Sequence, residues 1–125
     1  MPAQIRWIKC ESEKCESGAW CKLNSVNLQH SHFDGLEGVY IIWHYDGQRP
    51  ETLYVGQGKI RERLSAHHEN VAIQNSKYGP LHVTWAKVDA GDRDGVEAYL
   101  GDKLRPLVGE KFPAVHPVAV DLPEW

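Results

Sequence analysis

Two apolar runs in the first half of the chain give the clearest pattern of hydrophobic and polar positions. Residues 39–43 (VYIIW) are β-branched or aromatic without a break, which indicates a strand buried on both faces. A second run, LYV, follows at 53–55, after a stretch that contains Asp46-Gly47 and Pro50 and favours a turn. We expect the two runs to pair as an antiparallel hairpin with a long loop.

The pattern then changes to a helical one. Gly56 and Gly58 can turn the backbone sharply out of the second strand. Ile60, Leu64 and Val71 follow at helical spacing and predict a helix over about 59–74, closed by the breaker sequence at 79–80.

The second half of the chain predicts one more strand and one more helix. Residues 81–88 (LHVTWAKV) alternate well enough for a third strand. The stretch 89–95 (DAGDRDG) is typical of a loop in which an aspartate caps the next helix, and we favour this interpretation of Asp89, Asp92 and Asp94 over a metal site. Val96 and Leu100 then mark a helix of about three turns that ends near Pro106.

The element order β-β-α-β-α predicts an α/β (α+β) fold, a small three-stranded, mainly antiparallel sheet flanked by helices. The length of 125 residues fits one domain. We divide it into an N-terminal extension at 1–35 that packs on the core, with a strand at 5–9, a core at 36–112, and a C-terminal tail at 113–125. Prolines in the tail allow a short edge strand but not a central one.

Composition places the chain among globular proteins, with 42% hydrophobic and 25% charged residues. The sequence has no apolar run long enough to span a bilayer and no apolar stretch typical of a signal peptide, so we expect a cytoplasmic protein without a membrane partner. The net charge of −3 argues against nucleic-acid binding by bulk electrostatics, although a local basic patch can still act.

The three cysteines all lie within the first 21 residues. Their spacings of five and six do not match the CxxC pairs of common zinc sites. Together with His30 and His32 they could be written as a ligand set, but we favour reduced, partly buried thiols over zinc. The cysteines are Cys10, Cys15 and Cys21.

A compound motif carries the functional prediction. Gly-Val-Tyr at 38–40, a hairpin loop, Tyr-Val-Gly at 54–56, a helix with an R-x-x-x-H pattern and a later VEAYLGDKLRP segment follow one another. This combination resembles the GIY-YIG nuclease family, over a little more than half of the chain. The stretch YVGQGKIRERLSAHH is particularly similar to the nuclease domain of the bacterial excision-repair endonuclease.

The resemblance implies a metal-dependent endonuclease that hydrolyses phosphodiester bonds in DNA with one Mg²⁺ or Mn²⁺. It implies that Glu97 holds the metal with waters. Because the sequence has no recognisable separate DNA-reading domain, we expect specificity to come from a protein partner, a second copy of the chain or DNA shape. The implied catalytic residues are Tyr40, Tyr54, Arg63, His67 and Glu97. The residues assigned to substrate binding are Gly56, Gln57, Lys59 and Arg61, the last also being the alternative to Arg63 if the turn is one residue shorter.

Helical spacing agrees with these assignments. Lys59, Arg63 and His67 are four residues apart and form one stripe beside the apolar one. Glu97 follows Val96 and would lie at the edge of the buried face of its helix. A tyrosine acting as general base near neutral pH needs its pKa lowered from about 10, which a nearby metal and arginine could achieve. His67 is the competing base, and the sequence does not choose between them.

Each residue also has a purely structural interpretation, and the motif has departures. The tyrosines could be core residues, Arg63 a surface residue paired with a nearby glutamate, and Glu97 a favourable charge near a helix N-terminus. Gln57 stands where family members often have lysine. Many members also carry an asparagine a few residues after the proline that ends the glutamate helix, and no asparagine follows Pro106. The alternative function is therefore a catalytically weak or inactive nuclease-fold module that binds nucleic acid or a protein partner.

Overall fold

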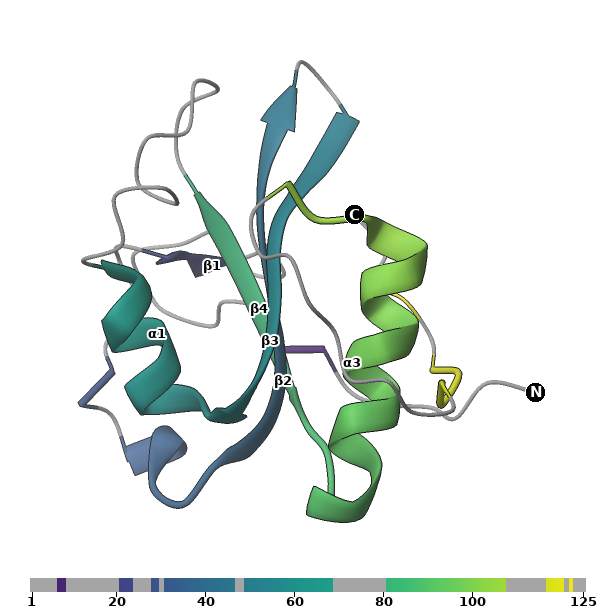
Figure 1. Cartoon of the computed structure of the whole chain (residues 1–125). Helices are drawn as coiled ribbons and strands as arrows, with labels where there is room; N and C mark the ends of the chain where they lie inside the picture. The colour runs from purple at the N-terminus through teal and green to yellow at the C-terminus, as the bar shows by residue number, and fades with distance from the viewer. Residues whose placement is uncertain are drawn as a thin grey trace.

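The computed structural model describes residues 7–8, 21–23, 28–29, 31–46, 49–68, 81–107, 117–120 and 122. Its centre is an antiparallel sheet with the strand order β1-β4-β2-β3, and Figure 1 shows helices α1 and α3 on opposite sides of this sheet. In chain order the elements are β1 (Cys21–Lys22), the 3-10 helix η2 (Ser31–Phe33), β2 (Glu37–Asp46), β3 (Arg49–Lys59), α1 (Ile60–His68), β4 (His82–Lys87) and α3 (Ala90–Leu104).

The predicted fold class is confirmed. The three predicted strands are β2, β3 and β4, and the central strand β2 pairs with both of the others. The two-residue strand β1 pairs with β4 and adds a short fourth strand at that edge, which is too brief to leave a pattern in the sequence. Strand β3 forms the opposite edge, where Pro50 is tolerated because it removes a backbone donor only at the sheet margin.

The hairpin is longer than predicted at both ends. Strand β3 does not turn at Gly56 but continues to Lys59, where it pairs with Glu37, so the expected sharp turn after the second strand was wrong. The reason is that β2 begins at Glu37 and supplies backbone partners that hold the glycine-containing stretch in the sheet. Gly58 adapts with a positive φ of 124° and lies opposite Gly38.

Strand β2 is buried on both faces, as predicted, and each face packs on one helix. Tyr40 and Ile42 belong to the core cluster that contains Leu64 of α1. Val39, Ile41 and Trp43 point to the other face, in the cluster that contains Val96 and Leu100 of α3. The alternation along one strand therefore separates the α1 layer from the α3 layer.

Helix α3 begins earlier than predicted, because the stretch 89–95 is not a loop. Asp89 is the N-cap, without a side-chain capping hydrogen bond, whereas Asp92 and Asp94 lie inside the helix. Burial of Gly95, Val96 and Leu100 against the sheet outweighs the low helix propensity of the glycines. Helix α1 is described to His68, and the rest of the predicted helix, 69–74, lies outside the described residues.

The described parts of both end segments contact the core. Leu23, Leu28 and Phe33 are buried in the α1-side cluster. Near the C-terminus, Val118 donates its backbone N–H to the Gly95 carbonyl, and Val120 is buried. Of the predicted strand at 5–9, only residues 7–8 are described; they lie outside a strand, although Ile8 donates to the Trp85 carbonyl.

Two further predictions concern zinc at the N-terminal cysteines and the membrane. Cys10, Cys15 and His30 lie outside the described residues, and only the backbone of Cys21 is described, in β1, so the structure does not test the predictions for the N-terminal thiols. Within the described ranges, the helices are too short or too polar to cross a bilayer.

Candidate active site

Two tyrosines from the hairpin face the same side of the sheet. Tyr40 lies on β2 and Tyr54 on β3, and their ring centroids are 6.0 Å apart with the planes inclined by 16°. Tyr40 is directly opposite Gly56, so Tyr54 is its diagonal neighbour across the pair of strands. Tyr40 is almost fully buried, at 1% exposure, whereas Tyr54 is half-buried.

Gly56 makes room for the Tyr40 ring. A Cβ atom at Gly56 would lie 2.5 Å from Cζ of Tyr40, a distance that real side chains do not adopt. The absence of a side chain at this position therefore allows the buried phenol to lie across strand β3.

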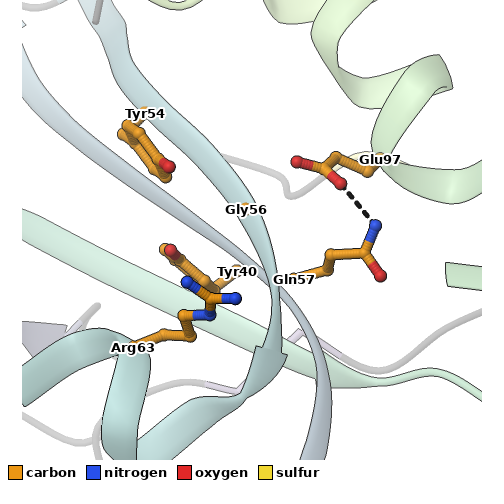
Figure 2. A pocket seen from close by; sticks show the side chains of 6 residues that line it. All are labelled: Tyr40, Tyr54, Gly56, Gln57, Arg63 and Glu97. Atoms are coloured by element: carbon orange, nitrogen blue, oxygen red, sulfur yellow. Dashed lines mark hydrogen bonds between the residues drawn. The ribbon is translucent and has the colours of Figure 1, made fainter. Parts of the chain in front are cut away.

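Arg63 enters from the first turn of α1, directly after β3 ends. The exposed guanidinium lies close to the backbone of Gly58, where a Cβ atom would be 3.0 Å from Nε of Arg63. Figure 2 shows the guanidinium beside the Tyr40 ring. The glycine thus has two roles, since it adopts a positive φ and leaves space for the arginine.

Glu97 reaches the same region from α3, on the other side of the sheet. Gln57 follows Gly56 on β3, and its side chain points to the α3 face, where Nε2 donates to Oε2 of Glu97 at 2.5 Å (Figure 2). The same nitrogen donates to Oδ1 of Asp94 at 2.6 Å. Glu97 is half-buried and Asp94 is exposed.

These side chains meet in an open pocket of about 280 Å³ at the β3 edge of the sheet. The pocket combines groups that are far apart in the chain, from β2, β3, α1 and α3 (Figure 2). Its lining residues are Tyr40, Tyr54, Gly56, Gln57, Arg63 and Glu97. The structure therefore brings together four of the five predicted catalytic residues and two of the four predicted substrate contacts.

His67 lies behind the pocket and not in its lining. The Tyr40 hydroxyl and Nε2 of His67 are 2.6 Å apart in a buried hydrogen bond. The imidazole also lies against Tyr54, with ring centroids 4.5 Å apart. His67 therefore contacts both pocket tyrosines, and its hydrogen bond with Tyr40 links it to a residue of the lining.

Burial raises the pKa of the Tyr40 hydroxyl far above its ordinary value. The nearby Tyr54 and Glu97 raise it further, and only the positive charge of Arg63 opposes them. The charge of Arg63 alone therefore does not make this phenol acidic, because desolvation outweighs it in the protein without a bound metal. Tyr40 is a neutral phenol in this state. The expected lowering of the pKa by metal and arginine together stays a prediction.

The Glu97 carboxyl group is also affected by its surroundings. Burial raises its pKa, and the neighbouring Asp94 charge raises it further. The hydrogen bond from Gln57 and the charge of Arg63 act in the opposite direction. A half-buried carboxylate of this kind gains from a positive partner, because the partner compensates for lost hydration.

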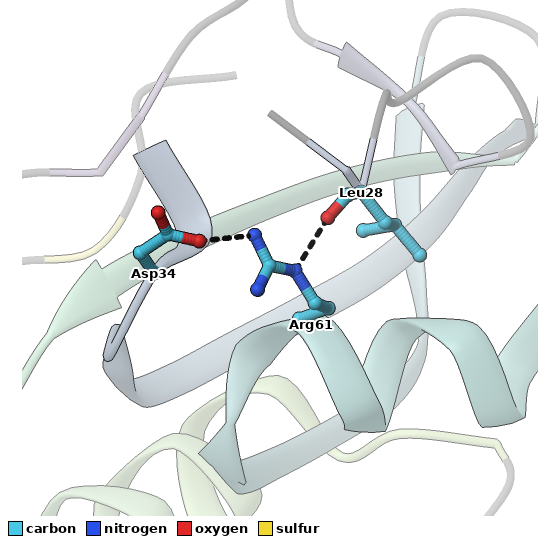
Figure 3. A network of polar contacts seen from close by, with 3 residues as sticks. All are labelled: Leu28, Asp34 and Arg61. Carbon is cyan, nitrogen blue, oxygen red and sulfur yellow. Dashed lines mark hydrogen bonds and ion pairs between the residues drawn. The ribbon is translucent and has the colours of Figure 1, made fainter. Parts of the chain in front are cut away.

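The other two predicted contacts lie away from the pocket. Arg61 donates from Nε to the Leu28 carbonyl at 2.6 Å and from Nη2 to Asp34 at 2.7 Å (Figure 3). These bonds tie α1 to the segment that precedes β2, so Arg61 anchors the helix and Arg63 is the arginine of the pocket. Lys59 is exposed at the end of β3 and does not line the pocket.

The residues present fit a magnesium-type ion with few protein ligands. Across the part of the chain that the structure describes, no group of three His, Cys, Asp or Glu side chains is arranged to hold a metal. Magnesium, however, keeps several waters and needs only one or two carboxylates. Glu97 supplies one carboxylate at an open pocket, and Asp94 brings a second negative charge close to it.

Sequence reasoning missed Asp94 as part of this region. The signal was its position three residues before Glu97, which places both side chains on one side of a helix once 89–95 is recognised as helical.

No protein-family model, curated protein or solved structure matches this chain.

Proposed function

We propose that the protein is a metal-dependent endonuclease that hydrolyses phosphodiester bonds in DNA. The observation that supports this most is the convergence of two phenols, a guanidinium and a carboxylate on one open pocket. The phenols can donate hydrogen bonds, the guanidinium supplies positive charge for the phosphate, and the carboxylate can hold a cation, and phosphodiester hydrolysis uses all three. The choice of DNA rests on the resemblance to GIY-YIG nucleases.

Arg63 would bind the phosphate. Its guanidinium is exposed at the pocket and can donate two parallel hydrogen bonds to phosphate oxygens. The half-buried Tyr54 hydroxyl can donate to a further oxygen of the same group. Negative charge that develops on these oxygens in the transition state is stabilised by both residues.

Tyr40 and His67 would together remove the proton of the attacking water. The neutral phenol accepts a hydrogen bond from water on the pocket side while its own proton moves to Nε2 of His67, at 2.6 Å. The water oxygen bonds to phosphorus, and the bond from phosphorus to the 3′ oxygen breaks. The products are a 5′ phosphate and a 3′ hydroxyl, which takes up a proton from solvent.

Glu97 would hold the divalent cation, with the charge of Asp94 close by. When bound, such an ion supplies Lewis-acid stabilisation of the negative charge on the leaving oxygen. Its positive charge also compensates the desolvation that raises the pKa of Glu97.

The second candidate is a nuclease-fold module that binds nucleic acid or a protein without cutting. The net charge of −3 favours it, because a DNA-binding surface is usually basic. Purified protein incubated with supercoiled plasmid and Mg²⁺ or Mn²⁺ separates the two. The enzyme nicks the plasmid, and a chelator stops the reaction; shifted but intact plasmid with either metal would contradict the proposal and favour the binding module.

A further inference from the structure

Gln57 makes two bonds to α3 from a single nitrogen atom. Its Nε2 lies 2.5 Å from Oε2 of Glu97 and 2.6 Å from Oδ1 of Asp94. An amide nitrogen carries two hydrogen atoms, so one N–H can point to each carboxylate. This arrangement joins the edge strand β3 to helix α3 at the pocket.

The two carboxylates would otherwise repel each other. Asp94 and Glu97 are three residues apart on α3 and lie on one side of the helix. Like charges at this spacing are unfavourable, and a half-buried carboxylate without a donor loses hydration without compensation. A shared donor between them therefore restricts the rotamers of both side chains.

The bond to Gln57 uses only one oxygen of Glu97. Figure 2 shows the other carboxylate oxygen directed away from Gln57, toward the side of the pocket on which Tyr54 lies. No other described side chain donates to Glu97. One oxygen is thus held by the strand while the second faces the space in which a substrate phosphate would lie.

We propose that Gln57 is a positioning residue, which holds Glu97 against strand β3 so that its second oxygen faces the pocket and keeps Asp94 beside it. The expected effect on metal affinity rests on the proposed function. The contact between Gln57 and the two carboxylates does not. The neutral amide suits this role because it orients two anions without cancelling their charge. A lysine could donate to both carboxylates but would add a positive charge where a cation is needed.

The first measurement uses the full chain without metal and reports the contact alone. The side-chain amide resonances of Gln57 are followed by NMR in the wild type, in Asp94→Asn and in the matched control Asp102→Asn, which changes an exposed aspartate of the same helix. The two amide protons should shift in Asp94→Asn and stay in place in Asp102→Asn. Resonances of a solvated glutamine that neither variant moves would overturn the inference.

The second measurement is Mn²⁺ binding in the absence of DNA. Gln57→Ala should bind Mn²⁺ about ten- to a hundred-fold more weakly than the wild type, the usual effect of removing the partner that orients a metal ligand. Gln57→Lys should also bind Mn²⁺ more weakly, because its positive charge repels the cation. Undiminished Mn²⁺ affinity in both variants, with only a lower melting temperature, would mean a purely structural role and would overturn the inference.

The two measurements also separate this inference from the proposed function. If the amide signals respond as expected but wild type and Glu97→Gln bind Mn²⁺ equally, the contact exists and the metal-dependent function fails. If Glu97→Gln removes Mn²⁺ binding while Gln57→Ala retains it, the function stands and the positioning role fails.

Discussion

Replacing Gly56 with alanine tests the close packing of the Tyr40 ring on strand β3. The new Cβ would lie 2.5 Å from Cζ of Tyr40. Carbon atoms in favourable contact are about 3.5–4.0 Å apart, so the ring or the strand must move by roughly 1 Å. Tyr40 is 1% exposed and packs with Ile42 and Trp85, so the ring cannot swing into solvent.

The cost has two parts. Overpacking a well-filled core costs about 1–3 kcal/mol. Displacing the hydroxyl from His67 loses a buried hydrogen bond worth about 1 kcal/mol, which brings the expected loss of unfolding free energy to about 2–4 kcal/mol. At about 3–5 °C per kcal/mol for a domain of this size, the melting temperature should fall by about 6–20 °C.

Urea and thermal unfolding followed by circular dichroism measure this loss, and the chain offers a matched control. Gly91→Ala makes the same chemical change in α3, where the added Cβ has nothing within 4 Å. That variant should be as stable as the wild type or more stable by up to about 1 kcal/mol. A Gly56→Ala protein with the same urea midpoint and melting temperature as Gly91→Ala would refute the close packing of Tyr40 on Gly56.

Three further predictions concern the groups of the pocket. Tyr40→Phe should lower the cleavage rate about 100-fold or more, because the water loses its proton acceptor; a rate within two-fold of the wild type would exclude the Tyr40–His67 pair, at 2.6 Å, as the base. Arg63→Lys should reduce cleavage with little change in stability. Arg61→Ala should lower the free energy of unfolding by about 1–3 kcal/mol and leave the activity of the folded fraction unchanged. Lost activity in Arg61→Ala together with lost stability in Arg63→Lys would contradict the two roles. Glu97→Gln should stabilise the fold at neutral pH, because a carboxyl whose pKa is raised in the folded state disfavours folding once it ionises. The gain should vanish as the pH falls below the unfolded value near 4.3, and urea titrations from pH 3 to pH 8 that show no such trend would contradict the raised pKa.

The strands of the hairpin could be predicted because their residue types leave little choice. An uninterrupted run such as Val39–Trp43 fits a strand that is covered on both faces, and the structure buries all five residues. The ends of the hairpin depend instead on long-range pairing. Local propensity favours a turn at Gly56 and Gly58, but the backbone of Glu37 and Gly38 holds this stretch in the sheet.

The candidate site could be predicted to the extent that it follows the motif. Tyr40, Tyr54, Arg63 and Glu97 all line one pocket. The link between Gln57 and Asp94 could not be anticipated, because it requires α3 to begin before Asp94 and to lie beside the edge strand.

The direction of the Tyr40 pKa shift could not be predicted from the sequence. We expected a nearby metal and arginine to lower the phenol pKa, whereas in the protein without metal the core around the ring determines the direction of the shift. Desolvation depends on how many segments cover a side chain, and no local pattern reports that number.

The single-turnover rate of plasmid nicking in Mn²⁺ tests most directly whether this pocket cuts phosphodiester bonds. Wild type, Glu97→Gln and Glu62→Gln are compared at equal folded concentration, Glu62 being an exposed glutamate on α1 outside the pocket. We expect wild type and Glu62→Gln to nick at the same rate and Glu97→Gln to be slower by about 100-fold or more, since several kcal/mol of transition-state stabilisation depend on the metal. Nicking by Glu97→Gln at the wild-type rate, or none by any of the three proteins, would contradict this assignment.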